Sequence, residues 1–175
     1  FKSWFKTDKN LIYDHRYVFD EIGYNLKPLE MQGAMGLEQI KKLPKLEKAR
    51  RDNFKKLYKI FEKYSDYFIL PETTDKSNPC WFGFMPIIKE NNHFNRDDLV
   101  RFLELNKIQT RPYFTGNLLF HPAYNHLNEK YDYKQFGNAN IATTSAMLLG
   151  TYIGITDDKI AKIDFTLEKF FGSLS

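Results

Sequence analysis

The sequence contains a single cysteine, Cys80, so no disulfide bond can form within the chain. One thiol is also too few for a cysteine-rich zinc site or for an iron–sulfur cluster. The four histidines show no metal-ligand spacing with one another or with Cys80, and we therefore expect no bound metal. Because a chain without disulfides suits a reducing compartment, we expect a cytoplasmic protein.

Long hydrophobic runs are also absent. No apolar stretch approaches the ~18 residues that span a bilayer, so no association with a membrane is expected. The sequence has no phosphate-binding glycine loop, no dinucleotide-binding glycine pattern and no Ser–His–Asp signature. The chain begins with Phe1 instead of Met, and residues 1–4 do not read as a signal peptide, so we expect part of a longer protein.

Aromatic residues, in contrast, are abundant. They make up 17% of the 175 residues, with 16 Phe and 11 Tyr, and 42% of all residues are hydrophobic. A chain of this length can bury one core and fits a single domain, with or without an appendage. We expect this core to consist largely of packed rings.

Basic side chains are concentrated in one segment. The net charge of the chain is +4, yet residues 41–63 contain ten basic and three acidic side chains. Apolar residues recur there at helical spacing, from Leu46 to Tyr64, which predicts an amphipathic helix with a basic outer face. A polyanion-binding surface is the alternative. The charged face has no interleaved aromatic residues, so a solvated face is favoured and nucleic acid is not an expected partner.

The order of the predicted elements indicates an α/β fold, in which a small sheet packed with helices follows two long helices. Residues 1–20 lack a clear period and are predicted to form an irregular arm. The predicted helices cover residues 28–43, 45–64, 95–105, 138–147 and 157–171, and the predicted strands cover 67–70, 81–89, 108–114 and 148–153. Residues 81–89 are apolar throughout, which is typical of a strand buried on both faces.

The first predicted helix is unusually rich in small residues, with Gly33, Ala34 and Gly36 in its interior. Each glycine costs about 1 kcal/mol against alanine inside a helix. The pattern therefore suggests that another backbone comes close, although packing within the chain's own core is an alternative. Asn25 lies in the polar turn before this helix, and Pro28 suits the first helical turn.

Several groups of residues together resemble one protein family. In chain order they are Gly23-Tyr24-Asn25 with the helix from Met31-Gln32 to Leu43, Pro79-Cys80-Trp81-Phe82-Gly83-Phe84, Asn106-Lys107-Ile108-Gln109-Thr110-Arg111 with Phe114-Thr115-Gly116-Asn117, and Pro122-Ala123-Tyr124. On these motifs the chain resembles the DegT/DnrJ/EryC1/StrS family of pyridoxal-phosphate (PLP) proteins, which have the aspartate aminotransferase fold. Within that family it is most similar to the 3-dehydratases of 4-keto-6-deoxyhexose nucleotides.

The resemblance implies the C-terminal part of such a protein. Residues 1–27 would form an arm and a cofactor-proximal loop of the large domain, residues 28–66 the connecting long helices, and residues 67–175 the C-terminal small α/β domain. The cofactor would be PLP or pyridoxamine phosphate (PMP), shared with the missing N-terminal half and with a partner subunit in a homodimer. The substrate would be a nucleotide sugar, and the pathway would supply deoxysugars for surface polysaccharide such as lipopolysaccharide.

Four residues are candidate contacts of cofactor or substrate: three match such positions in the family, and the fourth, Asn117, begins a loop after Gly116. Asn25 would donate an amide hydrogen bond to the cofactor phosphate of the neighbouring subunit, with helix capping as the alternative. Tyr17 would place its ring against the substrate, or pack elsewhere. Arg111 would bind a diphosphate or carboxylate, and Asn117 would hydrogen-bond sugar hydroxyls. For these two, an exposed strand end and an ordinary loop are the alternatives.

No catalytic base is expected within this chain. The position that is lysine in the aminotransferases and histidine in the dehydratases belongs upstream, as do the main phosphate-binding turn and the carboxylate that pairs with the cofactor ring. His121 is not assigned as the base, because the dehydratases usually have a different residue there. The chain also departs from the family where Tyr-Pro-Gly-Leu-Thr is replaced by Tyr152-Ile153-Gly154-Ile155-Thr156.

Three functions therefore remain open. The favoured one is a PLP- or PMP-dependent sugar-nucleotide 3-dehydratase, in which the C3 hydroxyl group leaves a 4-keto-6-deoxyhexose. The second is a sugar-nucleotide aminotransferase of the same family, with a lysine base. The third is a non-enzymatic interaction module that uses the basic helix. Under either enzymatic hypothesis, this chain alone is expected to be inactive.

Overall fold

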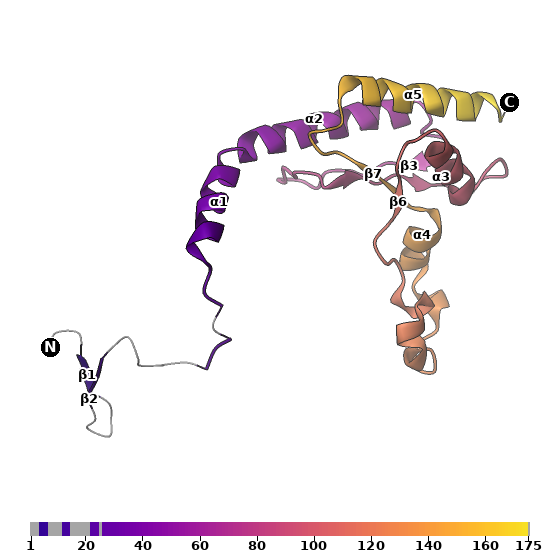
Figure 1. Ribbon diagram of the computed structural model, residues 1–175. Helices are drawn as coiled ribbons and strands as arrows, with labels where there is room; N and C mark the ends of the chain where they lie inside the picture. The colour runs from indigo at the N-terminus through magenta and orange to yellow at the C-terminus, as the bar shows by residue number, and fades with distance from the viewer. Residues whose placement is uncertain (1–3, 7–11, 15–21, 25, 175) are drawn as a thin grey trace. The chain divides into compact units, whose positions relative to one another are not determined.

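The computed structural model describes residues 4–6, 12–14, 22–24 and 26–174, which form two compact units (Figure 1). The first unit is Phe1–Lys41 and the second is Lys42–Ser175, and each is described by itself. Asn25 and Tyr17, two of the predicted site residues, lie outside the described residues. In the described part, no helix combines the length and the hydrophobicity that crossing a membrane requires.

The first unit contains a short hairpin and one helix. Strands β1 (Trp4–Lys6) and β2 (Ile12–Asp14) pair antiparallel within the segment that was predicted to be irregular. Helix α1 (Glu30–Ile40) begins later than predicted, so Pro28 lies before the helix and not in its first turn. The helix begins at Glu30 because Leu29 is extended and its N–H donates to Gln32 Oε1 at 2.8 Å.

Helix α1 buries none of its residues against the described part of the chain. A Cβ atom built on Gly33 or Gly36 would meet no described atom within 4 Å. The close backbone approach that these glycines suggested is therefore not made by the described residues. The apolar side chains of α1 are exposed as well, for example Met31 and Leu37.

Helix α2 (Leu43–Glu62) opens the second unit and confirms the predicted amphipathic helix. Pro44 lies in its first turn, where the missing N–H needs no partner, and this explains the break after α1. The buried residues follow helical spacing: Asn53, Phe54, Leu57, Ile60 and Phe61. The basic side chains line the remaining surface.

The strands are short and antiparallel. They are β3 (Phe68–Ile69), β4 (Gly83–Phe84), β5 (Ile87–Ile88), β6 (Arg111–Pro112) and β7 (Met147–Gly150). One sheet has the order β4-β7-β6, and β3 pairs with β5 in a second. Only two residues of the predicted strand 108–114 are therefore in a strand.

The prediction of one continuous strand over residues 81–89 is wrong. The segment divides into β4 and β5 around Pro86, which has no N–H to contribute to a ladder. β4 pairs with β7, whereas β5 pairs with β3. An isolated bridge between Ile87 and Ala146, and a hydrogen bond from Met147 N to Pro86 O at 3.2 Å, still join the two sheets.

Three further helices complete the unit: α3 (Arg96–Leu105), α4 (Gly137–Ser145) and α5 (Asp157–Gly172). Asn95 caps α3, because its side chain accepts from the N–H groups of Asp97 and Asp98. Helix α4 ends before the predicted boundary, since Met147 already begins β7. Short 3₁₀ turns occupy much of the segment between β6 and α4.

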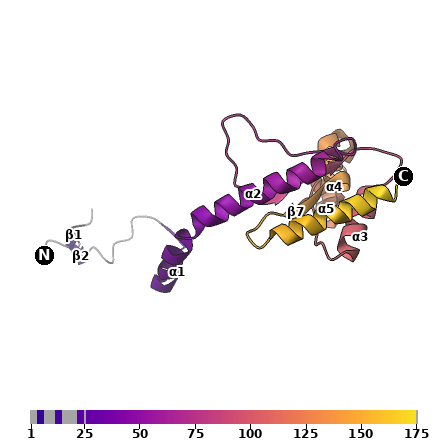
Figure 2. The ribbon, with the colours of Figure 1, turned by 90° about the horizontal axis from the view of Figure 1, so that it is seen from above.

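The core lies between the helices and the small sheets. Helices α2 and α5 run side by side, as Figures 1 and 2 both show, and α3 packs against α5. Phe61 and Phe84 are fully buried, with ring centroids 5.0 Å apart. Phe54 stacks on Trp81 at 4.2 Å. The predicted ring-packed core is confirmed.

Candidate functional site

Arg111 lies at a small pocket beside β7, which we call the arginine pocket. The pocket has a volume of about 260 Å³, and its lining includes Arg50, Phe82, Gln109, Arg111, Thr151 and Tyr152. Arg111 is exposed on β6 and pairs through its backbone with Leu148. The structure thus brings the predicted anion-binding arginine together with a second guanidinium group, that of Arg50, which had not been singled out in the sequence.

Helix α2 supplies Arg50 and holds it against the segment that leads into β4. The Arg50 Nη1 atom donates to the carbonyl oxygens of Trp81 at 3.3 Å and Phe82 at 3.4 Å. Its guanidinium carbon lies 5.7 Å from the centroid of the Phe82 ring, and that ring is 72% exposed. The arginine pocket therefore has a positively charged wall with an aromatic ring beside it.

Asn53, one turn further along α2, fixes the part of the lining that is formed by Thr151 and Tyr152. Its buried Nδ2 atom donates to Thr151 O at 3.3 Å and to Tyr152 O at 3.0 Å. The Thr151 hydroxyl group donates to Trp81 O at 2.8 Å, which ties the end of β7 to the approach to β4. In the sequence, the only sign that Asn53 makes buried hydrogen bonds is its position among the apolar residues of the helix.

The electrostatics of the arginine pocket favour an anion. Two guanidinium groups line the pocket, and no carboxylate is among its lining residues. The nearby carboxylate of Glu104 is engaged elsewhere, since it accepts from the hydroxyl group of Thr110 at 2.9 Å and also from the Thr110 N–H. Guanidinium groups bind phosphate and carboxylate oxygens with paired N–H donors.

Asn117 lies apart from the arginine pocket and has structural partners. It is buried, its Oδ1 atom accepts from Leu119 N at 3.0 Å, and its Nδ2 atom donates to Asn140 Oδ1 at 2.6 Å. Gly116, with φ of 61°, allows the sharp turn before it, where any Cβ would strike Thr143. The structure does not bring Asn117 and Arg111 into one pocket.

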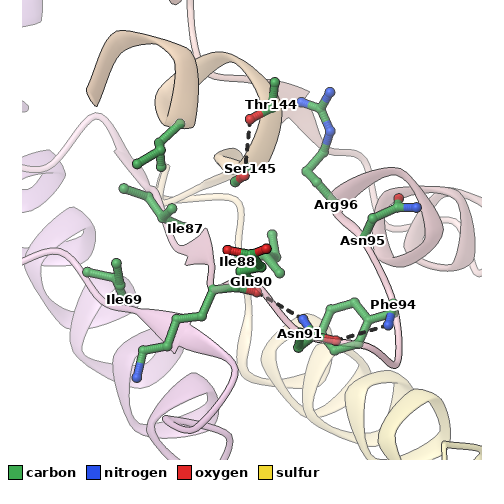
Figure 3. Close-up of a pocket in the computed structure, with 12 residues that line it drawn as sticks. Ile69, Ile87, Ile88, Glu90, Asn91, Phe94, Asn95, Arg96, Thr144 and Ser145 are labelled. Atoms are coloured by element: carbon green, nitrogen blue, oxygen red, sulfur yellow. Dashed lines mark hydrogen bonds between the residues drawn. The ribbon is translucent and has the colours of Figure 1, made fainter. Parts of the chain in front are cut away.

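A larger cleft of the second unit is a weaker candidate (Figure 3). It has a volume of about 540 Å³ and lies between β5, the start of α3 and α4. Its polar groups already hydrogen-bond within the fold: Arg96 donates to Thr143 O and Ala146 O, and Asn91 accepts from Phe94 N. Thr144 and Ser145 pair their hydroxyl groups with each other, which leaves few groups for a ligand.

Metal binding has no support in the described part of the chain, where no three His, Cys, Asp or Glu side chains gather as a ligand set. Cys80 is exposed and lies outside the lining of the arginine pocket. The imidazole of His121 donates through Nε2 to Thr115 O at 2.9 Å, in the loop that also carries Asn117.

Comparison with known proteins matches nearly the whole chain to one family. The model of the DegT/DnrJ/EryC1/StrS aminotransferase family matches residues 6–168. The lipopolysaccharide biosynthesis protein RfbH of Salmonella typhimurium is 37% identical over 161 residues, which are 91% of this chain and 36% of that protein. The dTDP-4-dehydro-2,6-dideoxy-D-glucose 3-dehydratase of Saccharopolyspora spinosa is 36% identical over 93% of this chain and 35% of its own. The chain thus spans about a third of the length of these curated relatives.

Solved structures agree with this match. The E. coli GDP-4-keto-6-deoxy-D-mannose-3-dehydratase with bound hydrated PLP superposes with a TM-score of 0.73 and 30% identity, over 93% of this chain and 40% of that chain. An aminotransferase from Psychrobacter cryohalolentis superposes with a TM-score of 0.78 at 14% identity, over 90% of this chain and 42% of that chain, which shows the fold alone. The predicted α/β fold of the PLP aminotransferase type is confirmed.

Proposed function

Because this chain belongs to the DegT/DnrJ/EryC1/StrS aminotransferase family, we propose that it is the C-terminal part of a PLP- or PMP-dependent sugar-nucleotide 3-dehydratase. The supporting observation is the level of identity. The curated and solved relatives named 3-dehydratases are 30–40% identical to the chain, over 61–93% of its length. The superposed aminotransferase from Psychrobacter cryohalolentis has only 14% identity. Aminotransfer by the same family is thus the weaker alternative, and a non-enzymatic basic module is weaker still.

The cofactor of this proposed enzyme is PLP or PMP, which supplies an electron sink for breaking bonds beside the sugar ketone. The described residues fit the phosphate-bearing substrate of such an enzyme, because two guanidinium groups line a pocket without carboxylates. We assign to Asn25 an amide hydrogen bond to the cofactor phosphate, across the interface of a homodimer. The remaining cofactor contacts and the base are assigned to residues upstream of this chain.

The substrate is assigned as a 4-keto-6-deoxyhexose linked to a nucleoside diphosphate. Arg111 would bind a phosphate group of this substrate, with Arg50 beside it on the same pocket. Tyr17 would contact the sugar or the base. Asn117 has one amide N–H beyond the hydrogen bonds described above, and a sugar hydroxyl is the partner that we propose for it. Such an enzyme would act in the cytoplasm to supply deoxysugars for surface polysaccharide.

The test is the product that the intact protein forms from a GDP-linked 4-keto-6-deoxyhexose in the presence of PMP. A 3-dehydratase yields a sugar that has lost its C3 oxygen, and mass spectrometry detects this loss. A product that keeps this oxygen and carries an amine at C4 would assign the protein to the aminotransferases. In Arg111→Lys, the KM for the nucleotide sugar should rise about tenfold, because lysine cannot make the paired contact.

A further inference from the structure

A second pocket adjoins the arginine pocket, and we call it the lysine pocket. It has a volume of about 310 Å³ and shares Gln109, Gly150 and Tyr152 with the arginine pocket. Its other lining residues come from the end of α3, from β7 and from α5. Together the two pockets are within the size range of clefts that hold small ligands.

The lysine pocket has an apolar floor and an aromatic wall. Ile108, Leu149 and Ile163 are buried beneath it. The Tyr152 ring is 52% exposed and lies directly over Gly154, where a Cβ atom would be 2.2 Å from a ring carbon. Because residue 154 is a glycine, the Tyr152 ring can lie at this position. The ring offers a flat surface to a sugar or a base.

Three lysines, Lys107, Lys159 and Lys162, line the lysine pocket, and no carboxylate does. Lys159 and Lys162 are one turn apart on α5, so they share a face of that helix. Lys159 donates to Gly154 O at 2.7 Å, which holds its ammonium group beside the turn that carries Tyr152. Within the described residues, none of the three makes a salt bridge.

Lys107 has a backbone conformation that favours glycine, with φ of 62°. It follows α3 directly, and the N–H of the next residue, Ile108, donates to Leu103 O at 3.0 Å, as in a helix C-terminal motif. Glycine or asparagine would fit this position with less strain. Lysine at this point is therefore unfavourable for the fold, yet it adds a third ammonium group to the pocket.

Part of the acidic charge of α5 is directed at α2. Asp157 and Asp164 pair with lysines of α2, Lys56 at 2.5 Å and Lys63 at 2.7 Å, while Asp158 lies outside the lining of the pocket. The lysines 159 and 162 of α5 face the pocket instead. The pocket side of α5 is therefore left with positive charge that has no acidic neighbour in the lining, and an anionic ligand would relieve the repulsion.

We propose that the lysine pocket binds the phosphate groups of a nucleoside diphosphate, whose sugar or base lies against Tyr152. The inference rests on the proposed function for the choice of nucleotide, and it deepens that function by assigning residues to the diphosphate. The three lysines and Arg111 of the adjoining pocket supply the charge, and Gln109, common to both pockets, supplies an amide. Two small adjoining pockets suit a small ligand. Proteins that bind single-stranded RNA have instead a long groove that follows the RNA backbone.

Calorimetric titration of the 175-residue chain with GDP at low salt tests this proposal. In the double variant Lys107→Gln/Lys162→Gln, the affinity for GDP should fall about tenfold or more, because two charge-assisted contacts are lost. The matched control is Lys55→Gln/Lys59→Gln, which removes the same charge from exposed positions of α2 outside both pockets. The control should keep its affinity within about twofold, because neither side chain lines a pocket and neither would contact a phosphate group.

The variant Lys107→Gly tests whether the affinity for GDP falls without a loss of stability of the fold. Glycine suits the positive φ at this position, so the variant should unfold at the same or a higher temperature while it binds GDP more weakly. An unchanged affinity in this folded variant and in Lys107→Gln/Lys162→Gln would overturn the proposal. Equal losses in the double variant and its control would overturn it too, because net charge alone would then explain the binding.

Two comparison ligands complete the experiment. Guanosine, which lacks phosphates, should bind far more weakly than GDP, and the opposite order would contradict the assignment. An RNA oligonucleotide that binds more tightly than GDP, and that depends on Lys55 and Lys59, would identify a nucleic-acid surface on α2 instead. If GDP binding fails in these tests while the intact protein still forms the 3-deoxy sugar, the proposed function stands and only the lysine pocket is wrongly assigned.

Discussion

At the scale of single residues, Asn53 has the largest structural effect on the candidate site. Its buried amide bonds to two consecutive carbonyl groups, those of Thr151 and Tyr152. Tyr152 lines both pockets, so the same amide fixes the position of both. Asn53, on the buried face of α2, thus positions the site through its hydrogen bonds to the backbone just after β7.

Asn53→Ala should lower the free energy of unfolding by about 1–3 kcal/mol, because the buried carbonyl group of Thr151 and the partly buried one of Tyr152 lose their donor. Urea denaturation of the purified chain measures this change. Asn92→Ala, at an exposed loop position, is the matched control and should change the free energy by less than about 0.5 kcal/mol. Equal stability of the two variants would show that the Asn53 amide does not hold the wall of the arginine pocket.

The residues of the site could be predicted from the sequence only in part. Arg111 was predicted from its match to a family position, and the structure places it at an anion-favouring pocket. Arg50 was one of ten basic residues in a periodic helix, and nothing local distinguished it. Its role depends on Trp81 and Phe82, which are about thirty positions away in the chain. Such long-range contacts leave no trace in local patterns.

At the scale of elements, the helices were predicted well and the strands poorly. The spacing of apolar residues in α2 and α5 carries a strong helical signal, so these helices were recognised with nearly correct bounds. Several strands have only two residues, which is too few for any alternation to show. Their pairing is set by tertiary contacts, and Pro86 changes the partner in the middle of an apolar run.

The contact between α2 and α5 predicts a dependence of stability on alkaline pH. Lys63 donates to both carboxylate oxygens of Asp164, at 2.7 and 2.8 Å, and this hydrogen bond is the main reason that the pKa of Lys63 is raised. A raised pKa in the folded state adds stability below the pKa of the unfolded chain, and this stability is lost as the pH rises through the folded pKa.

Lys63→Met should therefore be less stable than the parent chain at neutral pH. The difference should begin to shrink near about pH 10.4, where lysine loses its proton in the unfolded chain, and should vanish once the pH has passed the raised pKa of Lys63 in the folded chain. The effect should be small, because both partners are partly exposed. Lys59→Met, an exposed change on the same helix, should show no such trend. A difference that persists undiminished at high pH would assign the effect to packing of the lysine stem instead.

At the scale of the whole molecule, the two units differ in how they are stabilised. All buried residues of the hydrophobic core lie between Phe54 and Phe170, in the second unit. Helix α1, in the first unit, buries no residue against the described chain. Its open apolar face supports the proposal that residues outside this chain, or a partner subunit, cover it in the intact protein.

Removal of residues 1–41 should thus leave the second unit folded, with a free energy of unfolding changed by less than about 0.5 kcal/mol. Urea denaturation followed by Trp81 fluorescence reports on this core, because Trp81 stacks on Phe54. The deletion also removes Trp4, which leaves Trp81 as the only tryptophan. A large loss of stability would mean that the first unit supports the core of the second.

The most direct test of the account follows the C3 oxygen of the sugar. The intact protein is supplied with PMP and with a GDP-linked 4-keto-6-deoxyhexose that carries a heavy-oxygen label at C3. We predict that the label leaves the sugar and appears in water. A label that remains on the sugar, while an amine appears at C4, would contradict the assignment as a 3-dehydratase.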